Sequence, residues 1–197
     1  MTAFEILMDI SNKNNGLILT KTAADNGVSR ASLSQLCKAG KISRVAKGQY
    51  VLADALNDEM LSLSIRSDLI VFSHESALFL NGISDRTPFE HAVTIPSSKT
   101  LARSISEQCK IYYIKDDLHN MGKVQLITPM GNSVPAYDMD RTVCDIVTSR
   151  SRIADETFLS SLKQYAANPQ KNLANLSIYA SRMGILQQVR KCLEVLL

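Results

Sequence analysis

The side chains between Arg30 and Lys38 have types and a spacing that suit contacts with DNA bases. On a helix with about 3.6 residues per turn, one face and its flanks would carry short polar, amide and cationic side chains. They are Arg30, Ala31, Ser32, Ser34, Gln35 and Lys38. Hydroxyl and amide groups bond base edges, and cations bond guanine or phosphate oxygens. A polar helix face taken alone is more often simply solvated, so the prediction depends on the neighbouring elements.

Two short helices joined by a glycine turn would position this face. The pattern predicts a first helix over residues 21–26, closed by Gly27, and a second over 30–39, closed by Gly40. Ser29 is expected to cap the second helix. The apolar face of that helix comprises Leu33, Leu36 and Cys37. Helix-turn-helix proteins use this order of elements to place one helix in the major groove.

A basic hairpin, the wing, is predicted over residues 42–52, directly after the second helix. Arg44 lies on its first strand and Lys47 at its tip, where Gly48 lets the chain reverse. Residues 1–53 carry seven Lys or Arg against three Asp or Glu, a net charge of +4, whereas the whole chain carries +3. This concentration of charge is typical of phosphate binding and predicts an affinity that falls with salt.

The start of the first helix offers further phosphate contacts. Thr20, Lys21 and Thr22 lie where free backbone amides and the positive end of the helix dipole favour an anion. The hydroxyl of Thr20 is expected to act chiefly as the helix cap. The complete set of predicted DNA-binding residues is Thr20, Lys21, Thr22, Ser29, Arg30, Ser32, Ser34, Gln35, Lys38, Arg44 and Lys47.

The length of the chain predicts a second domain. Its 197 residues exceed the about 60–80 residues that a winged helix-turn-helix needs. We expect a winged helix-turn-helix DNA-binding domain over residues 1–53 and a second domain over residues 57–197. The hydrophobic fraction of 45% is sufficient for two cores.

The second domain is expected to be mixed α/β, after a helix that ends near residue 66. The predicted strands are 69–72, 92–95, 111–114, 124–127 and 134–137. The predicted helices are 73–82, 140–148, 155–166, 173–181 and 185–196. Because strands come first and helices follow, the fold class is predicted to be α+β, with a second domain that ends in helices.

The last predicted helix carries an apolar stripe that could form a dimer seam. Its residues are Ile185, Leu186, Val189, Cys192, Leu193, Leu196 and Leu197. We expect the stripe to be intramolecular core instead, because a short α+β domain needs a cover for its sheet. The chain should therefore be a monomer or weak dimer that pairs on two adjacent DNA half-sites.

Two acidic pairs offer weak evidence for catalysis. Asp116-Asp117 and the pair Asp138 and Asp140 could hold Mg²⁺ in a metal-dependent nuclease. A nuclease core usually carries a carboxylate on one strand and a carboxylate–lysine pair on the next, and this pattern is not met. The pairs fit better as turn and helix-cap residues. We expect no catalytic residue and no enzyme activity.

No cofactor or metal site is expected. The three histidines and four cysteines lack the paired spacing of zinc ligands, and the cysteines are predicted to be reduced, buried thiols. His74 and His119 are expected at the surface or in helix caps. No stretch approaches the about 18 consecutive apolar residues of a membrane span, and the N-terminus lacks the features of a signal peptide, so we expect a cytoplasmic protein.

Motifs distributed along the whole chain resemble those of one family. A winged helix is followed by Ser-His-Glu-Ser-Ala-Leu at 73–78 with Asn-Gly-Ile at 81–83, Ala-Val-Thr-Ile-Pro at 92–96, and the segment 137–145, which contains Arg141-Thr142 and Asp145. In this order they resemble the AbiEi antitoxins of abortive-infection AbiE toxin–antitoxin systems. Arg141 and Asp145, four residues apart on a helix, would form a structural ion pair worth a few tenths of a kcal/mol.

The resemblance implies a transcriptional repressor and antitoxin that acts in phage defence. Its first domain would bind inverted repeats in the promoter of its own operon. Its second domain would counter a nucleotidyltransferase-like toxin without a stable complex, in a type IV system. A ligand-responsive winged-helix regulator is the alternative from the residues themselves, and it would need an apolar pocket with a few polar groups in the second domain.

Overall fold

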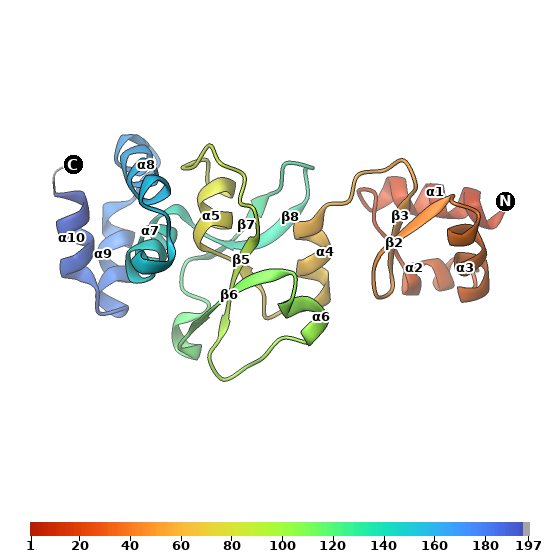
Figure 1. Cartoon of the computed structure of the whole chain (residues 1–197), viewed down its shortest axis with the longest axis horizontal. Helices are drawn as coiled ribbons and strands as arrows, with labels where there is room; N and C mark the ends of the chain where they lie inside the picture. The colour runs from red at the N-terminus through yellow and green to blue at the C-terminus, as the bar shows by residue number, and fades with distance from the viewer. Residues whose placement is uncertain (195–197) are drawn as a thin grey trace. The chain divides into compact units, whose positions relative to one another are not determined.

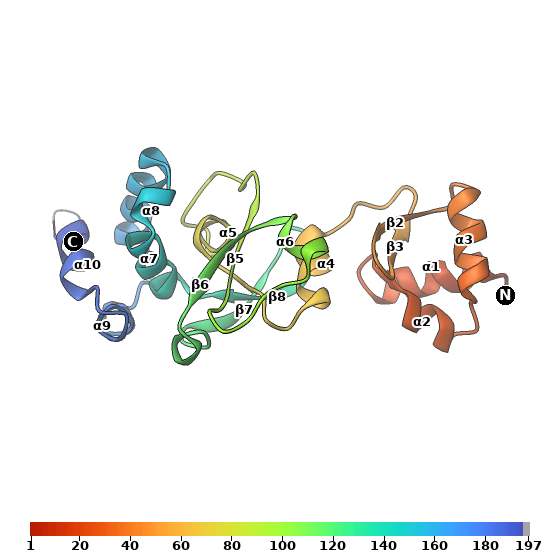
Figure 2. The ribbon, with the colours of Figure 1, turned by 60° about the horizontal axis from the view of Figure 1, so that its bottom comes forward.

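The computed structural model describes residues 1–194 and divides the chain into two compact units (Figure 1, Figure 2). Unit 1 comprises residues 1–65 together with 128–132. Unit 2 comprises residues 66–127 and the chain from residue 133 onward. Helices and two separate sheets make up these units, so the fold class is α+β, as predicted.

Unit 1 combines short helices with a small sheet. Its elements are α1 (Ala3–Lys13), β1 (Ile18–Leu19), α2 (Thr20–Asp25), α3 (Arg30–Lys38), β2 (Ile42–Ala46), β3 (Gln49–Leu52) and α4 (Glu59–Arg66). The three strands form an antiparallel sheet of order β1-β3-β2. The two short helices and the hairpin predicted from the sequence are therefore present, within a residue or two of the expected bounds.

Local sequence signals explain where these helices begin. Thr2 forms a capping box with Glu5, whose carboxylate accepts from the Thr2 N–H at 2.7 Å. Ser29 caps α3, as predicted, because its hydroxyl accepts from the Ser32 N–H at 3.0 Å. Caps of this kind each stabilise a helix by about 0.5–2 kcal/mol.

The core of unit 1 lies where α1, α2 and α3 meet the sheet. Its buried side chains are Leu7, Ile10, Ile18, Ala23, Val28, Leu33 and Ile42. Burying one large apolar side chain contributes about 1.5–3 kcal/mol. Leu33 anchors α3 in this core, and Leu36 and Cys37 pack against it, as predicted. The polar face of α3 is consequently left to solvent.

Two segments outside the predicted DNA-binding domain complete unit 1. The buried Gln49 side chain on β3 donates to the Ser62 carbonyl on α4 at 3.2 Å, and the Ser62 hydroxyl donates back to Gln49. The carboxylate of Asp58 accepts from the Asn132 amide at 2.7 Å and from the Thr128 hydroxyl. These bonds hold α4 and the loop of residues 128–132 within the unit.

The compact units do not coincide with the predicted domains. The expected division into residues 1–53 and 57–197 lies earlier in the chain than the division after Ile65. The loop 128–132 was not expected in unit 1, because no local pattern links it to a segment so far away in sequence. Independent folding of residues 1–53 and of residues 57–197 stays a prediction.

Unit 2 contains a mixed five-stranded sheet. Its strands are β4 (Val71–Phe72), β5 (His91–Pro96), β6 (Cys109–Ile114), β7 (Lys123–Ile127) and β8 (Ser133–Tyr137). They lie in the order β6-β5-β4-β8-β7. The pairs β5–β6 and β4–β8 are parallel, whereas β4–β5 and β7–β8 are antiparallel. All five strands were predicted, with β4 shorter than expected.

Most helices of unit 2 pack around one central helix. The helices are α5 (His74–Leu80), α6 (Arg103–Ser106), α7 (Met139–Thr148), α8 (Asp155–Ala167), α9 (Leu173–Arg182) and α10 (Leu186–Leu193), with 3₁₀ turns at Asp116–Leu118 and Arg150–Arg152. Residues 139–147 of α7 are buried, and α7 contacts α5, α8, α9 and α10. Helix α6 was not predicted, because four residues are too short to show a helical period.

The C-terminal stripe packs inside unit 2, as predicted. Ile185, Val189 and Leu193 are buried in the same core as α7, with Leu186 and Cys192 packed against it. Leu196 and Leu197, the last members of the predicted stripe, lie outside the described residues. The described part of the stripe is therefore core rather than a dimer seam.

The Arg141–Asp145 ion pair, which the sequence predicted from its spacing, is buried. Both side chains are buried, and Arg141 Nε donates to Asp145 Oδ1 at 3.0 Å. Arg141 Nη1 also donates to the carbonyls of Leu118, at 2.9 Å, and Met121, at 2.6 Å. A side chain at Gly122 would lie 2.6 Å from Arg141 Cβ, so glycine permits this approach. The predicted few tenths of a kcal/mol apply to exposed pairs, whereas removing one partner of a buried pair costs about 3–5 kcal/mol.

Candidate nucleic-acid interface

One face of α3 is exposed and carries most of the predicted base-reading groups. Arg30, Ser34, Gln35 and Lys38 are exposed, and Ser32 on the flank is half-buried. The opposite face is fixed by Leu33, which is 1% exposed. The orientation of α3 is thus set by its apolar residues, and the amide, hydroxyl and cationic groups share the free side.

The start of α3 is shaped by a glycine turn and a serine pair. Gly27 has a φ of +82°, a left-handed conformation that allows α2 and α3 to follow each other closely. The hydroxyls of Ser29 and Ser32 lie 3.0 Å apart, and Ser29 also caps the helix. Both predicted contact serines therefore have local partners, which leaves the later residues of α3 freer to meet a ligand.

The start of α2 lies against the tip of the predicted wing. The Thr20 N–H donates to the Gly48 carbonyl at 2.9 Å, so the predicted phosphate contacts Thr20, Lys21 and Thr22 are tied to the turn that carries Lys47. Sequence reasoning missed this bond because its two residues are distant in the chain. The prediction that Thr20 caps α2 is wrong: Leu19 is the cap residue, with no side-chain bond, because β1 runs directly into the helix.

The cations of this surface are available to a ligand. Lys21, Arg30, Lys38 and Lys47 are exposed and form no ion pair with any residue in the described range 1–194. Arg44 donates only to the Ala46 carbonyl, at 3.3 Å. By contrast, Lys13 and Asp9 on α1 neutralise each other at 2.6 Å. Uncompensated positive charge on one face attracts a polyanion from a distance.

The second unit holds a buried histidine rather than the expected surface one. His74 is 3% exposed, with a left-handed φ of +47° at the start of α5. Its Nδ1 lies 2.9 Å from Ser73 Oγ and its Nε2 lies 3.0 Å from Ser149 Oγ. The ring stacks on Tyr112 with centroids 3.4 Å apart. The expectation of a surface or capping role is wrong, because both ring nitrogens and one ring face have protein partners.

His119 is also buried, and its environment is structural. Its Nε2 lies 3.0 Å from the Leu69 carbonyl, and its own carbonyl accepts from the Tyr137 hydroxyl at 2.8 Å. Burial lowers the pKa of His119 below its usual value, which favours the neutral ring. The prediction of a surface position for His119 is therefore also wrong.

Asp138 and Asp140 act as a helix cap and a cross-link, whereas Asp116 and Asp117 are exposed. Asp138 caps α7 by accepting from the Arg141 N–H at 2.7 Å, as predicted for a residue at a helix start. Asp140 accepts from the Tyr165 hydroxyl at 2.8 Å and from the Asn172 N–H at 2.9 Å. Within residues 1–194, no group of three or more His, Cys, Asp or Glu is placed to hold a metal ion.

The cysteines have no reactive environment in unit 2. Cys109 and Cys144 are buried, as predicted, and burial raises the pKa of their thiols to about 11 and about 12. Cys37 and Cys192 are half-buried free thiols. A raised pKa leaves little thiolate, the reactive form, at neutral pH.

The burial of His74 predicts a pH-dependent stability. Burial, followed by the charges of Lys110, Arg152 and Arg141, lowers the pKa of His74 well below its usual value. Below about pH 6.5 the unfolded chain binds a proton that folded His74 does not, so stability falls as pH drops, by up to about 1.4 kcal/mol per pH unit. We expect His74→Asn, which tolerates the left-handed backbone, to lose less stability than wild type between pH 7.5 and 5.5.

Urea denaturation of both proteins at the two pH values measures this difference directly. All other titrating groups are common to both chains and cancel in the comparison. Equal losses of unfolding free energy in wild type and His74→Asn would show that His74 takes up its proton in the folded state.

Comparison with known proteins gives a family match and a related fold. Residues 5–53 match the family model described as "Transcriptional regulator, AbiEi antitoxin". A search of curated proteins finds no match. The crystal structure of the RV2827C protein from Mycobacterium tuberculosis superposes with a TM-score of 0.73, over 98% of this chain and 77% of that chain, at 15% sequence identity. At this identity the likeness concerns the fold alone.

The family match covers the segment that contains the whole candidate interface. It includes α2, α3 and both strands of the hairpin, and it ends one residue after β3. In the described part of the chain, no helix is long and apolar enough to span a membrane. Residues 5–53 are therefore similar to the AbiEi antitoxin family of transcriptional regulators, the family that the sequence motifs indicated.

Proposed function

We propose that unit 1 is a winged helix-turn-helix that binds inverted repeats in the promoter of its own operon and represses it. The observation that carries this proposal is the exposed face of α3, which combines Gln35 with Arg30 and Lys38, two cations that form no ion pair within residues 1–194. A helix of this size and polarity fits the major groove, where amide and cationic groups distinguish base pairs. The hairpin β2–β3 would serve as the wing.

The proposed DNA-binding residues form two groups, those that contact base edges and those that contact phosphates. Ser34, Gln35, Lys38 and Arg30 would face base edges, whereas Lys21, Arg44 and Lys47 would hold phosphates. The bond between Thr20 and Gly48 supports the second group, because it places the start of α2 beside the wing tip. One such module covers a small surface, so two copies of a monomeric or weakly dimeric chain would pair on adjacent half-sites.

The second part of the proposal concerns the antitoxin role. Unit 2 would counter a nucleotidyltransferase-like toxin of the same operon, without a stable complex between the two proteins, as part of a cytoplasmic phage-defence system. The family description supports an antitoxin role in general terms. The buried histidines and the pair Asp138 and Asp140 support a non-enzymatic role, because they form hydrogen bonds within the fold.

The double substitution Gln35→Ala with Lys38→Ala tests the proposed recognition helix. It removes one base-reading amide and one cation and leaves Leu33 and the cap of α3 in place. Each lost base contact costs about 1–3 kcal/mol, so affinity for the promoter repeat should fall at least tenfold and base preference should relax. Fluorescence anisotropy with promoter and scrambled duplexes measures both effects. Wild-type affinity in the double variant would refute the assignment of α3.

Lys47→Ala should act differently, because it removes a phosphate contact. We expect it to weaken promoter and scrambled duplexes alike and to lower the slope of log affinity against log salt by about 1. Lys13→Ala is the matched control, since Lys13 is already paired with Asp9 on α1. An unchanged salt slope in Lys47→Ala, or an equal change in Lys13→Ala, would exclude the wing tip from the interface.

A further inference from the structure

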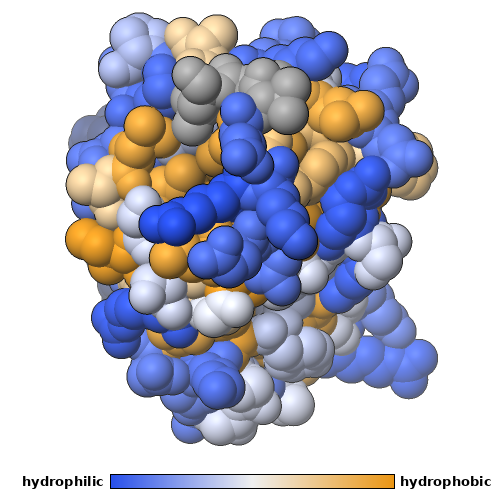
Figure 3. Space-filling model, turned by 90° about the vertical axis from the view of Figure 1, so that its left-hand side faces the viewer, coloured by the Kyte–Doolittle hydropathy of each residue, from blue (hydrophilic) through white to orange (hydrophobic). Residues whose placement is uncertain are grey.

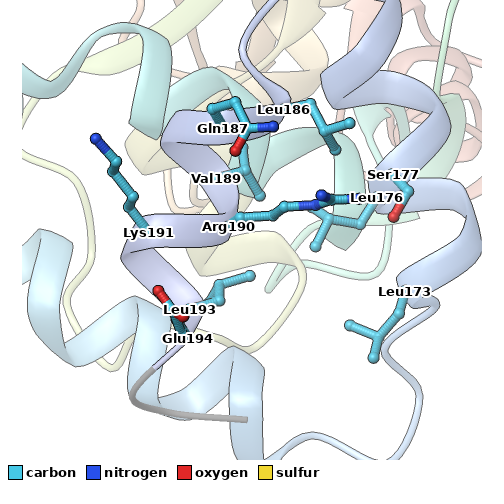
Figure 4. A pocket seen from close by; sticks show the side chains of 10 residues that line it. All are labelled: Leu173, Leu176, Ser177, Leu186, Gln187, Val189, Arg190, Lys191, Leu193 and Glu194. Atoms are coloured by element: carbon cyan, nitrogen blue, oxygen red, sulfur yellow. The ribbon is translucent and has the colours of Figure 1, made fainter.

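A pocket lies between α9 and α10 in unit 2, remote in sequence from the candidate DNA interface. Its volume is about 560 Å³, within the range of about 300–1,000 Å³ that is usual for small-molecule sites. Figure 3 shows the side of the molecule on which these helices lie, with apolar surface exposed between hydrophilic side chains. Figure 4 shows the pocket itself, with α9 on one side and α10 on the other.

Five of the ten residues that line the pocket are aliphatic. Leu176, Val189 and Leu193 form part of it and are at most 5% exposed, because they also belong to the core of unit 2. Leu173, which is 44% exposed, lines it from α9, and Leu186 lines it from α10. An apolar group that entered this pocket would be removed from water on more than one side, which is favourable.

One cation lies across this apolar surface. In Figure 4 the Arg190 side chain extends from α10 toward Leu176 and Ser177 on α9, whereas that of Lys191, which also lines the pocket, extends away from α9. Arg190 forms no ion pair with any residue of the described chain, including Glu194, the C-cap of α10. A guanidinium offers several donors in a plane, which suits a carboxylate, sulfonate or phosphate oxygen pair.

We propose that this pocket binds a small amphipathic anion, a molecule with a hydrocarbon part and a single anionic head. The hydrocarbon would lie against Leu173, Leu176 and Leu186, and the head would bond Arg190. The inference goes beyond the proposed repressor and antitoxin roles and does not depend on them. An apolar pocket with a few polar groups is also what a ligand-responsive regulator would need in its second domain.

The chain contains no tryptophan, so a single introduced tryptophan can report on the pocket. Leu173→Trp places the reporter in the pocket wall, and Ile178→Trp places a matched one at an exposed position of α9 outside the lining. Titration of the full-length chain with decanoate should shift the Leu173→Trp emission to shorter wavelength and saturate, and should leave the Ile178→Trp emission unchanged. Calorimetry of wild type with decanoate provides the affinity without a reporter.

The charge of the ligand head tests the role of Arg190. Decanoate should bind wild type more tightly than decyltrimethylammonium, which has the same chain length and the opposite charge. Arg190→Gln should weaken decanoate about three- to tenfold and leave decyltrimethylammonium unchanged, since the lost ionic bond is partly screened by solvent. Arg182→Gln is the matched control, because Arg182 is an exposed cation of α9 that does not line the pocket.

Several outcomes would overturn the proposal. One is an equal response of the Leu173→Trp and Ile178→Trp emission to decanoate. Another is an equal affinity of wild type for decanoate and decyltrimethylammonium, and a third is an Arg190→Gln variant that binds decanoate as tightly as wild type does. A further one is a stable dimer by light scattering that Leu173→Trp converts to a monomer, since a second copy of the chain would then cover the groove. Circular dichroism of each variant establishes that any loss of binding occurs in a folded protein.

Discussion

Replacing Arg141 with alanine should lower the free energy of unfolding by about 3–5 kcal/mol, because it leaves the Asp145 carboxylate buried without its partner. The same change removes the bonds from Arg141 to the carbonyls of Leu118 and Met121, which tie the segment before β7 to α7. Guanidinium chloride denaturation of the full chain measures the loss. A change of this size is a large fraction of the stability of an ordinary domain.

Arg103→Ala is a matched control for this experiment. Arg103 and Glu107 form an ion pair with the same four-residue spacing, but their side chains are 90% and 59% exposed. Exposed pairs of this kind contribute about 0.2–1 kcal/mol or less, so the control should change stability little. If Arg141→Ala costs no more than Arg103→Ala, burial of the pair does not have the energetic role inferred from its geometry.

A double variant separates the charge from the packing. Arg141→Met with Asp145→Leu replaces both buried charges by apolar groups of similar length. It should be more stable than Arg141→Ala, because no unpaired charge remains in the core. It should still fall below wild type, because the carbonyls of Leu118 and Met121 lose their donor.

The candidate interface could be predicted from the sequence because its signals are local. Leu33 marks the buried face of α3, and Ser29 and Gly27 mark its start. Each of these features acts over one or two helical turns, so spacing along the chain is enough to reveal it. Gln35 and Lys38 are exposed as a direct consequence of where Leu33 must point.

What the sequence could not reveal depends on contacts between distant segments. The spacing of Arg141 and Asp145 gives the pair but not its burial, which results from the packing of α7 among α5, α8, α9 and α10. His74 carries a polar ring, and only its stacking on Tyr112 and its bonds to serine hydroxyls make burial tolerable. The bond from Thr20 to Gly48 likewise has no local signature.

The two proposed functions should be separable by substitutions on α3. We expect a chain with Arg30→Ala, Gln35→Ala and Lys38→Ala to lose repression of its promoter almost completely and still rescue growth when the toxin of the same operon is co-expressed. The three side chains are exposed and outside the core of unit 1, so the variant should fold. A reporter gene measures repression, and colony counts measure rescue.

Point substitutions are preferable to a deletion of residues 1–53. Such a deletion would remove Gln49 and leave the Ser62 hydroxyl of α4 without its partner inside unit 1. A failure to rescue would then report on damage to the fold as much as on lost function. The matched control is Asp9→Ala with Lys13→Ala, an exposed pair on α1, which should keep both repression and rescue.

The result distinguishes two mechanisms of toxin control. Rescue without repression would place the antitoxin activity outside the α3 face and support a role for unit 2. If the triple variant is folded by circular dichroism, fails to bind promoter DNA and also fails to rescue, toxin control acts through transcription alone. In that case the groove-facing residues of α3 would account for both activities, and the division of functions proposed for the two units would be wrong.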